Sequence, residues 1–176
     1  MICLIPLRSS SKRLKDKNIK LIDDRPCFAY VLETAHRSGI FDKIIIAVDP
    51  EYEEIAKNNI PLGTILYVRD SQNSRDESPL IDLLREVVDF YLINDKSACI
   101  LYSTSVLTTE DQLKRSYKIL REVKYKCVFP VVRQENELFI DDYGANKNDC
   151  DYCLDDIAKH ADSFFMFDIK TVNIAC

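Results

Sequence analysis

The segment PLRSSSKRLKDKN, residues 6–18, places cationic and hydroxyl side chains directly after a short apolar run. Backbone N–H groups, serine hydroxyls and cationic heads together can hold phosphate groups. In such a site lysine supplies a point charge and arginine a two-pronged donor. The segment lacks the glycines of a Walker A loop and of a dinucleotide-binding fingerprint. The residues alone leave two interpretations open, a phosphate site and a solvated basic loop.

The charge of this segment contrasts with that of the rest of the chain. Between Arg8 and Lys20 there are six basic residues and one acid, a net +5, whereas the whole chain carries a formal −5. The remainder therefore carries about −10. A local positive site on a negative body suits a small polyanion better than a nucleic acid, whose long backbone the acidic remainder would repel. We therefore expect a small-molecule partner and no nucleic acid.

Composition favours a single ordinary globular domain over residues 1–176, because 47% of the residues are hydrophobic and 30% are charged. No run approaches the roughly 18 apolar residues of a membrane span, so no membrane partner is expected. The first ten residues become polar too soon for a signal peptide. The seven cysteines are scattered, and Cys3, Cys27, Cys99 and Cys127 have apolar neighbours. We expect buried thiols in a reducing compartment, and therefore a cytoplasmic protein.

Strand and helix signals alternate along the chain. Apolar runs predict buried strands at 2–7, 42–48, 64–69, 97–102, 126–132 and 163–169. Helical spacing, with proline or a capping residue near the start, predicts helices at 27–39, 51–59, 80–92 and 112–123. This order predicts an α/β fold, a mostly parallel sheet with helices on both faces. Ligands of such sheets bind beyond the carboxyl ends of the strands, which is where the basic segment begins.

The basic segment also resembles a known signature. PLRSSSKRLKDKNIK is similar to the loop P-A-R-x-G-S-K-R-x-x-x-K-N of the CMP-sugar synthetases, the acylneuraminate and pseudaminate cytidylyltransferases. The resemblance continues in order through RPCFAYVLETAHRSGIFDKIIIAVD, YVRDSQNSRDESPLIDLLREVV and ILYSTSVLTTEDQLKRSY, and ADSFFMFDI is a weaker echo of the family's A-G-Q-F-Y. Tyr102, where glutamine is the other family choice, leans toward the pseudaminate branch.

This resemblance implies a nucleotidyltransferase fold, Rossmann-like and similar to the GT-A glycosyltransferases, in proteins that are usually dimeric. It implies transfer of CMP from CTP to the anomeric hydroxyl of a nine-carbon keto-sugar acid of the sialic or pseudaminic acid type. Pyrophosphate is released, and Mg²⁺ is the expected cofactor. Catalysis of such a reaction is mostly positioning and neutralisation of charge. The implied partners are CTP, a small acidic sugar and a second copy of the chain.

The resemblance also implies roles for individual residues. The residues that would hold the triphosphate in a catalytic role are Arg8, Lys12 and Lys17. The matched nucleotide-binding positions, of which the last two correspond to contacts with the base, are Leu7, Arg8, Ser9, Ser10, Ser11, Lys12, Lys17, Asn18, Arg69 and Ser78. The positions expected beside the acceptor sugar are Tyr102, Ser103 and Thr104.

The sequence departs from the family pattern at several positions. Serine at position 9 or 10 replaces a loop glycine, and its Cβ could crowd a backbone that approaches phosphate closely. Val106 replaces a proline. Family members continue beyond the matched segment, where their Mg²⁺-binding aspartate pair lies; here Asp168 is the candidate metal ligand. Two hypotheses follow, an active synthetase and a catalytically silent relative that binds CTP or serves as an interaction module.

Three further features carry alternatives. Asp49, which precedes Pro50, is either a helix N-cap or a polar group at the edge of the site. Cys150 and Cys153 have zinc-ligand spacing, and with His160 could form a metal site, although free thiols in a polar loop are the simpler interpretation. The polar stretch at about 134–160 is either a hairpin or an arm that reaches a partner subunit.

Overall fold

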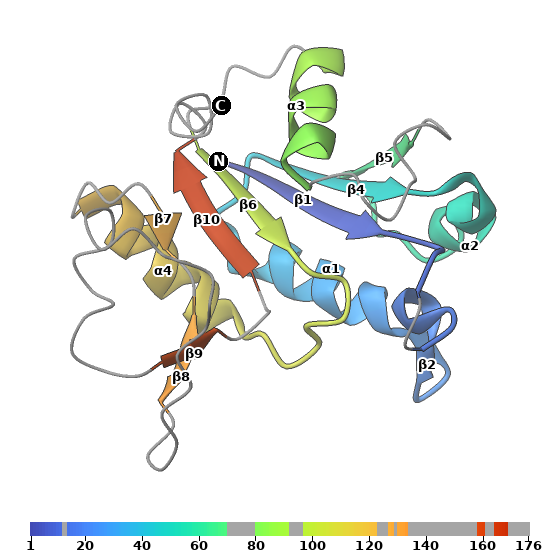
Figure 1. Ribbon diagram of the computed structural model, residues 1–176, viewed down its shortest axis with the longest axis horizontal. Helices are drawn as coiled ribbons and strands as arrows, with labels where there is room; N and C mark the ends of the chain where they lie inside the picture. Colours follow the sequence, from blue (N-terminus) through green and yellow to red (C-terminus); the bar gives the residue numbers. More distant parts are fainter. Residues whose placement is uncertain are drawn as a thin grey trace.

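A central six-stranded sheet organises the computed structural model, with α1 and α4 against one face and α3 against the other (Figure 1). The structure describes residues 1–11, 14–69, 80–91, 97–122, 127–128, 130–133, 158–160 and 164–168. The strands of the central sheet, in spatial order, are β5 (Thr64–Val68), β4 (Lys43–Val48), β1 (Ile2–Leu7), β6 (Ser97–Leu101), β10 (Phe164–Asp168) and β7 (Cys127–Val128).

The first four strands of this order run parallel, and β10 runs antiparallel to both of its neighbours. The prediction of a mostly parallel sheet with helices on both faces is therefore confirmed. Parallel strands need crossover connections, and the helices between them supply these. The consequence for function is geometric: β1, β4, β5 and β6 all end at one edge of the sheet.

The apolar runs form strands because both faces of the sheet are covered. All six residues of β1 are buried. Cys3, Ile5 and Leu7 belong to the core on the α1 and α4 side. Ile2 and Leu4 belong to the core beneath α3. This alternation is the two-residue period of a strand, applied to a segment with no polar face.

The helices among the described residues are α1 (Cys27–Ser38), α2 (Glu53–Lys57), α3 (Leu80–Phe90) and α4 (Glu110–Glu122), with short 3-10 turns η1 (Lys17–Ile19) and η2 (Pro50–Tyr52). Helix α1 follows Pro26 and ends at Gly39, whose φ of 65° is the left-handed conformation that glycine adopts easily. None of the helices in the described ranges combines the length and apolar character that a bilayer span requires.

Several predicted elements differ in the structure. The strand predicted at 126–132 is divided between β7 in the central sheet and β8 (Val131–Arg133), which pairs antiparallel with β9 (Ala158–His160). Pro130 lies between the two strands and has no N–H for a ladder. The predicted helix at 51–59 is a 3-10 turn followed by a single short helix.

One element was absent from the predictions. The strands β2 (Leu21–Ile22) and β3 (Arg25–Pro26) form a hairpin whose turn residues Asp23 and Asp24 both have positive φ. Aspartate tolerates this conformation better than most residues, which suits a two-residue hairpin turn.

The cysteines divide by position. Cys3, Cys27 and Cys99 are buried free thiols, as predicted, but Cys127 is exposed because β7 lies at the edge of the sheet. Cys150 and Cys153, and most of the predicted arm at 134–160, lie outside the described residues.

Candidate functional site

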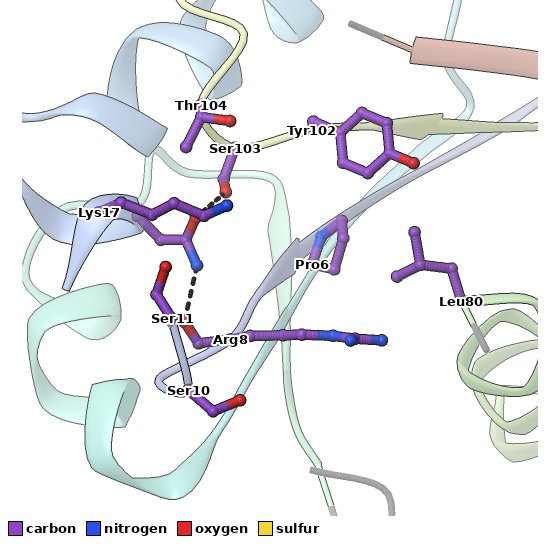
Figure 2. Close-up of a pocket in the computed structure, with 10 residues that line it drawn as sticks. Pro6, Arg8, Ser10, Ser11, Lys17, Leu80, Tyr102, Ser103 and Thr104 are labelled. Carbon is purple, nitrogen blue, oxygen red and sulfur yellow. Dashed lines mark hydrogen bonds between the residues drawn. The ribbon is translucent and has the colours of Figure 1, made fainter. Parts of the chain in front are cut away.

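A pocket of about 410 Å³ opens beyond the carboxyl ends of β1 and β6. The described residues that line it are Pro6, Arg8, Ser10, Ser11, Lys17, Asn18, Leu80, Tyr102, Ser103 and Thr104 (Figure 2). Eight of these ten were site candidates from the sequence, drawn from segments about 90 residues apart. The sequence argument missed two lining residues. Pro6 lies inside a buried strand, and Leu80 has the spacing of an ordinary helical core residue.

The chemistry of this lining is cationic and rich in hydroxyl groups. Arg8 and Lys17 supply positive charge, and Ser10, Ser11 and Thr104 supply hydroxyls. Among the described lining residues none is acidic. Such a set suits an anion with several oxygens, because each oxygen can accept from a cation or a hydroxyl. Figure 2 shows Arg8 extending across the floor of the pocket toward Leu80.

Asn18 joins the two loops that form the pocket. Its Nδ2 donates to the carbonyl oxygen of Arg8 at 2.7 Å, and its Oδ1 accepts from the Ser103 hydroxyl at 2.8 Å (Figure 2). The Asn18 side chain is buried, and its bond with Ser103 is shielded from water. Cys27 on α1 also donates through Sγ to the carbonyl oxygens of Lys17 and Asn18, at 3.1 and 3.0 Å. The turn that carries Lys17 is thus tied to the body of the domain.

Asp49 lies directly behind the beginning of the basic loop. Its side chain is fully buried, and Oδ2 accepts from the backbone N–H of Ser9 at 2.7 Å and from the Ser9 hydroxyl at 3.0 Å. The other oxygen accepts from Arg69 at 3.0 Å. Asp49 occupies the N-cap position of η2, as one of the two interpretations predicted, but its carboxylate makes no capping bond there. Asp49 instead supports the edge of the site.

Arg69 is also buried, with 2% of its surface exposed, and it is not among the lining residues. Burial lowers the pKa of the Arg69 guanidinium, and the positive charge of Arg8 lowers this pKa further. The negative charge of Asp49 acts in the opposite direction and raises it. Arg69 therefore lies behind the pocket, near enough to Arg8 for their charges to interact. The contact of Arg69 with a nucleotide base stays a prediction.

The single acid of the basic loop has a structural partner. Asp16 takes a left-handed conformation, with φ of 55°, and its Oδ1 accepts from the Tyr52 hydroxyl at 2.8 Å. Burial raises the pKa of Tyr52, and the hydrogen bond to Asp16 raises it further, so the phenol remains a donor at neutral pH. The loop is consequently anchored at a second point, from η2.

Two other predicted site residues, Leu7 and Ser9, are described but do not line the pocket. Leu7 is buried in the core, and its carbonyl oxygen accepts from the N–H of Asp49 at 3.2 Å. Ser9 faces Asp49 rather than the pocket. Lys12 and Ser78 lie outside the described residues.

The backbone of Asp168, the candidate metal ligand, lies away from the pocket. Because β10 runs antiparallel, Asp168 pairs with Ser97 at the amino end of β6, whereas Phe164 pairs with Leu101 at the end nearest the pocket. Asp168 therefore occupies the opposite edge of the sheet. Within the described part of the chain, no group of three or more His, Cys, Asp or Glu side chains could hold a metal.

Comparison with known proteins assigns the family. The family model described as cytidylyltransferase matches residues 2–152, so this chain belongs to the cytidylyltransferase family. It is 30% identical over 135 residues to the N-acylneuraminate cytidylyltransferase of Escherichia coli O18:K1:H7, covering 76% of this chain and 31% of that protein. It is 30% identical over 138 residues to the pseudaminic acid cytidylyltransferase of Campylobacter jejuni serotype O:2, covering 76% and 59%. The chain thus spans only part of the length of these relatives, and the resemblance to the CMP-sugar synthetases is confirmed.

Solved structures of similar shape support the fold. A CMP:2-keto-3-deoxy-manno-octonic acid synthetase complexed with CTP has a TM-score of 0.70 at 16% identity, covering 98% of this chain and 75% of that one. The 4-diphosphocytidyl-2C-methyl-D-erythritol synthase of Anaerococcus prevotii has a TM-score of 0.68 at 19% identity, covering 98% and 73%. The predicted nucleotidyltransferase-like α/β fold is therefore confirmed.

Proposed function

We propose that this protein transfers CMP from CTP to a nine-carbon keto-sugar acid of the sialic or pseudaminic acid type and releases pyrophosphate. The observation that carries the proposal is the pocket in which Arg8, Lys17 and Asn18 meet Tyr102–Thr104 beyond the carboxyl ends of β1 and β6. The cytidylyltransferase family supports the choice of nucleotide. The relatives named for N-acylneuraminate and pseudaminic acid support the choice of acceptor.

The proposed reaction is a displacement at the α-phosphorus of CTP. The anomeric hydroxyl oxygen of the sugar forms a new bond to that phosphorus, the bond to the bridging oxygen of the β-phosphate breaks, and the hydroxyl proton is released. Negative charge builds on the departing pyrophosphate, so cations fixed in advance around it lower the barrier. Holding both substrates in one pocket supplies the remaining advantage, because a bimolecular step becomes effectively unimolecular.

Arg8 and Lys17 are the described residues that would meet this charge. Lys17 is exposed at the pocket, and its backbone is held by Cys27, so the ammonium head extends from a fixed turn. Arg8 has its carbonyl oxygen held by Asn18 while its side chain reaches into the pocket. We assign the phosphates to this pair, and the hydroxyls of Ser10 and Ser11 to further phosphate oxygens.

Tyr102, Ser103 and Thr104 form the side of the pocket that we assign to the acceptor. Ser103 is buried and donates to Asn18, so it sets the shape of the pocket rather than offering a free hydroxyl. Thr104 is exposed and Tyr102 partly exposed, which leaves both able to contact a sugar. Mg²⁺ remains an expectation from the family resemblance, and no step proposed for this chain's residues depends on it.

Calorimetric titration of CTP into the purified protein tests the nucleotide half of the proposal, with ATP and GTP as comparisons and Mg²⁺ in the buffer. Selective binding of CTP is expected. Release of pyrophosphate with sialic or pseudaminic acid then tests the transfer. Binding of CTP without release would favour a catalytically silent relative, and binding of no nucleotide would overturn the proposal.

A further inference from the structure

Three parallel strands end side by side at the site, and one buried carboxylate connects all three. Leu7, Val48 and Val68 are aligned across β1, β4 and β5. Beyond them the N–H of Asp49 donates to Leu7 at 3.2 Å, and the N–H of Arg69 donates to Val48 at 2.8 Å. Asp49 therefore lies one residue beyond the end of β4, between the chain that follows β1 and the chain that follows β5.

The two oxygens of this carboxylate have different partners. Oδ2 accepts both the N–H and the hydroxyl of Ser9, and Oδ1 accepts the Arg69 guanidinium. Every partner is a donor, so only a group with two acceptor oxygens satisfies all three bonds. An asparagine would present an NH₂ group to one side and lose the bonds there. The site therefore demands an ionised acid and its counter-ion.

The residues beside Ser9 are the ones that reach the pocket. Arg8 and Ser10 both line it, whereas Ser9 points away from it toward Asp49. The carbonyl oxygen of Arg8 is held separately by Asn18. Two fixed points on consecutive residues leave little freedom in the backbone that presents the Arg8 and Ser10 side chains. Preorganisation of this kind contributes to affinity because less ordering remains to be done on binding.

We propose that Asp49 is a positioning residue of this site, which holds the loop of residues 8–11 through Ser9 in the geometry that receives phosphate groups, with Arg69 as its counter-ion. This inference rests on the proposed function, since it names what prepares the loop for a nucleotide triphosphate. It also gives the serine at position 9 a role, because the Ser9 hydroxyl adds a second bond to the same carboxylate oxygen.

The test compares Asp49→Asn with the double variant Asp49→Asn/Arg69→Met and with Ser9→Ala. The matched control is Asp42→Asn, which alters a carboxylate at the other end of β4. Affinities for CTP and for inorganic triphosphate are measured by calorimetry, and stability by urea unfolding. Inorganic triphosphate has no base, so its affinity is independent of any contact between Arg69 and cytosine.

The double variant separates positioning from charge balance, because methionine removes the cation that Asp49 neutralises. We expect it to recover most of the urea midpoint lost in Asp49→Asn, yet to bind inorganic triphosphate and CTP at least about tenfold more weakly than wild type. Ser9→Ala should show a smaller loss of affinity, and Asp42→Asn none. Wild-type affinity in the double variant would overturn the inference, because Asp49 would then only compensate Arg69.

Hydrogen exchange keeps the inference testable if the wild type binds neither ligand, an outcome that would overturn the proposed function. Faster exchange of the backbone amides at residues 9–11 in the double variant, and unchanged exchange in Asp42→Asn, would sustain the positioning role. Wild-type exchange rates in the double variant would overturn it.

Discussion

The two ends of β4 carry aspartates in opposite situations. Asp42, before the strand, pairs with the N-terminal amine of Met1 while 70% of its side chain remains exposed. Asp49, after the strand, has no exposed surface and pairs with an equally buried Arg69. The first pair lies at the amino edge of the sheet and the second at the carboxyl edge, beside the pocket.

This difference shows that the fold buries charged groups at the carboxyl edge of the sheet, although burying them costs free energy. Removing a carboxylate and a guanidinium from water carries a large desolvation cost, which is offset only by close partners and further hydrogen bonds. At the carboxyl edge Asn18 and Ser103 are buried as well, and each is hydrogen-bonded to a neighbouring loop residue. A buried polar network holds its side chains and loops in one arrangement. Ligands of α/β sheets bind at the carboxyl edge, so rigid loops are useful there.

The largest expected contrast comes from truncating the two aspartates. Asp49→Ala leaves the buried Arg69 guanidinium without its counter-ion, which should lower the free energy of unfolding by about 3–5 kcal/mol. Asp42→Ala breaks a pair whose carboxylate is 70% exposed, and should cost about 0–1 kcal/mol. Urea unfolding of both variants measures the difference. Equal losses at the two ends would show that burial at the carboxyl edge has no energetic consequence.

Loss of a cation at the pocket should act on binding rather than on folding. Lys17→Ala removes a charged donor from the pocket that we propose receives phosphate, so its CTP dissociation constant should rise about 10- to 100-fold, with stability nearly unchanged. The control is Lys57→Ala, because Lys57 pairs with Glu53 on the exposed side of α2. Calorimetry gives both constants. Unchanged affinity in Lys17→Ala would remove this turn from the site.

Removing the Asn18 side chain, which connects the two pocket loops, should lower both stability and CTP affinity. Asn18→Ala removes the donor to Arg8 and the acceptor for Ser103, and should cost about 1–3 kcal/mol in stability together with a measurable loss of CTP affinity. Asn59 is a matched control, since its amide donates to the carbonyl oxygen of Ile55 at 2.8 Å, away from the pocket. Asn59→Ala should reduce stability alone. A loss of affinity of the same size in both would contradict the bridging role.

The smallest effect is expected at the amino edge, in the pH dependence of stability. His36 bonds to Thr64 at 2.8 Å at the start of β5, and burial lowers the pKa of its imidazole. The folded state therefore binds this proton less readily than the unfolded chain, whose histidine has a pKa of about 6.5. The stability that His36 contributes is present above that value and declines as the pH falls below it.

Urea midpoints at pH 7.5, 6.5 and 5.5 measure this dependence. His36→Gln should flatten the slope over this interval, and the effect should be modest because the ring is only partly buried. An identical slope in the variant would assign the pH dependence to other groups.

Local patterns in the sequence account for much of the fold. The apolar runs at β1, β4 and β6 and the proline and glycine that bound α1 were sufficient to predict those elements, because burial on both faces and capping act over a few residues. The division of 126–132 between two sheets was not predicted, since strand pairing is decided by partners distant in the chain. The antiparallel direction of β10, which places Asp168 away from the pocket, was not predicted for the same reason. An apolar run predicts a strand but does not indicate whether that strand runs parallel or antiparallel to its neighbours.

The sequence by itself determined which residue types line the pocket. A cationic, serine-rich segment after the first strand, with a family-like order of motifs behind it, identified eight of the ten residues that the structure places around the pocket. Only the tertiary structure decided what holds them there. The bonds of Asp49 to Ser9 and Arg69 join residues 40 and 20 positions apart, and the bond of Asn18 to Ser103 joins residues 85 apart. Such contacts exist because the parallel strands end together at one edge of the sheet, and that convergence is a property of the folded sheet as a whole.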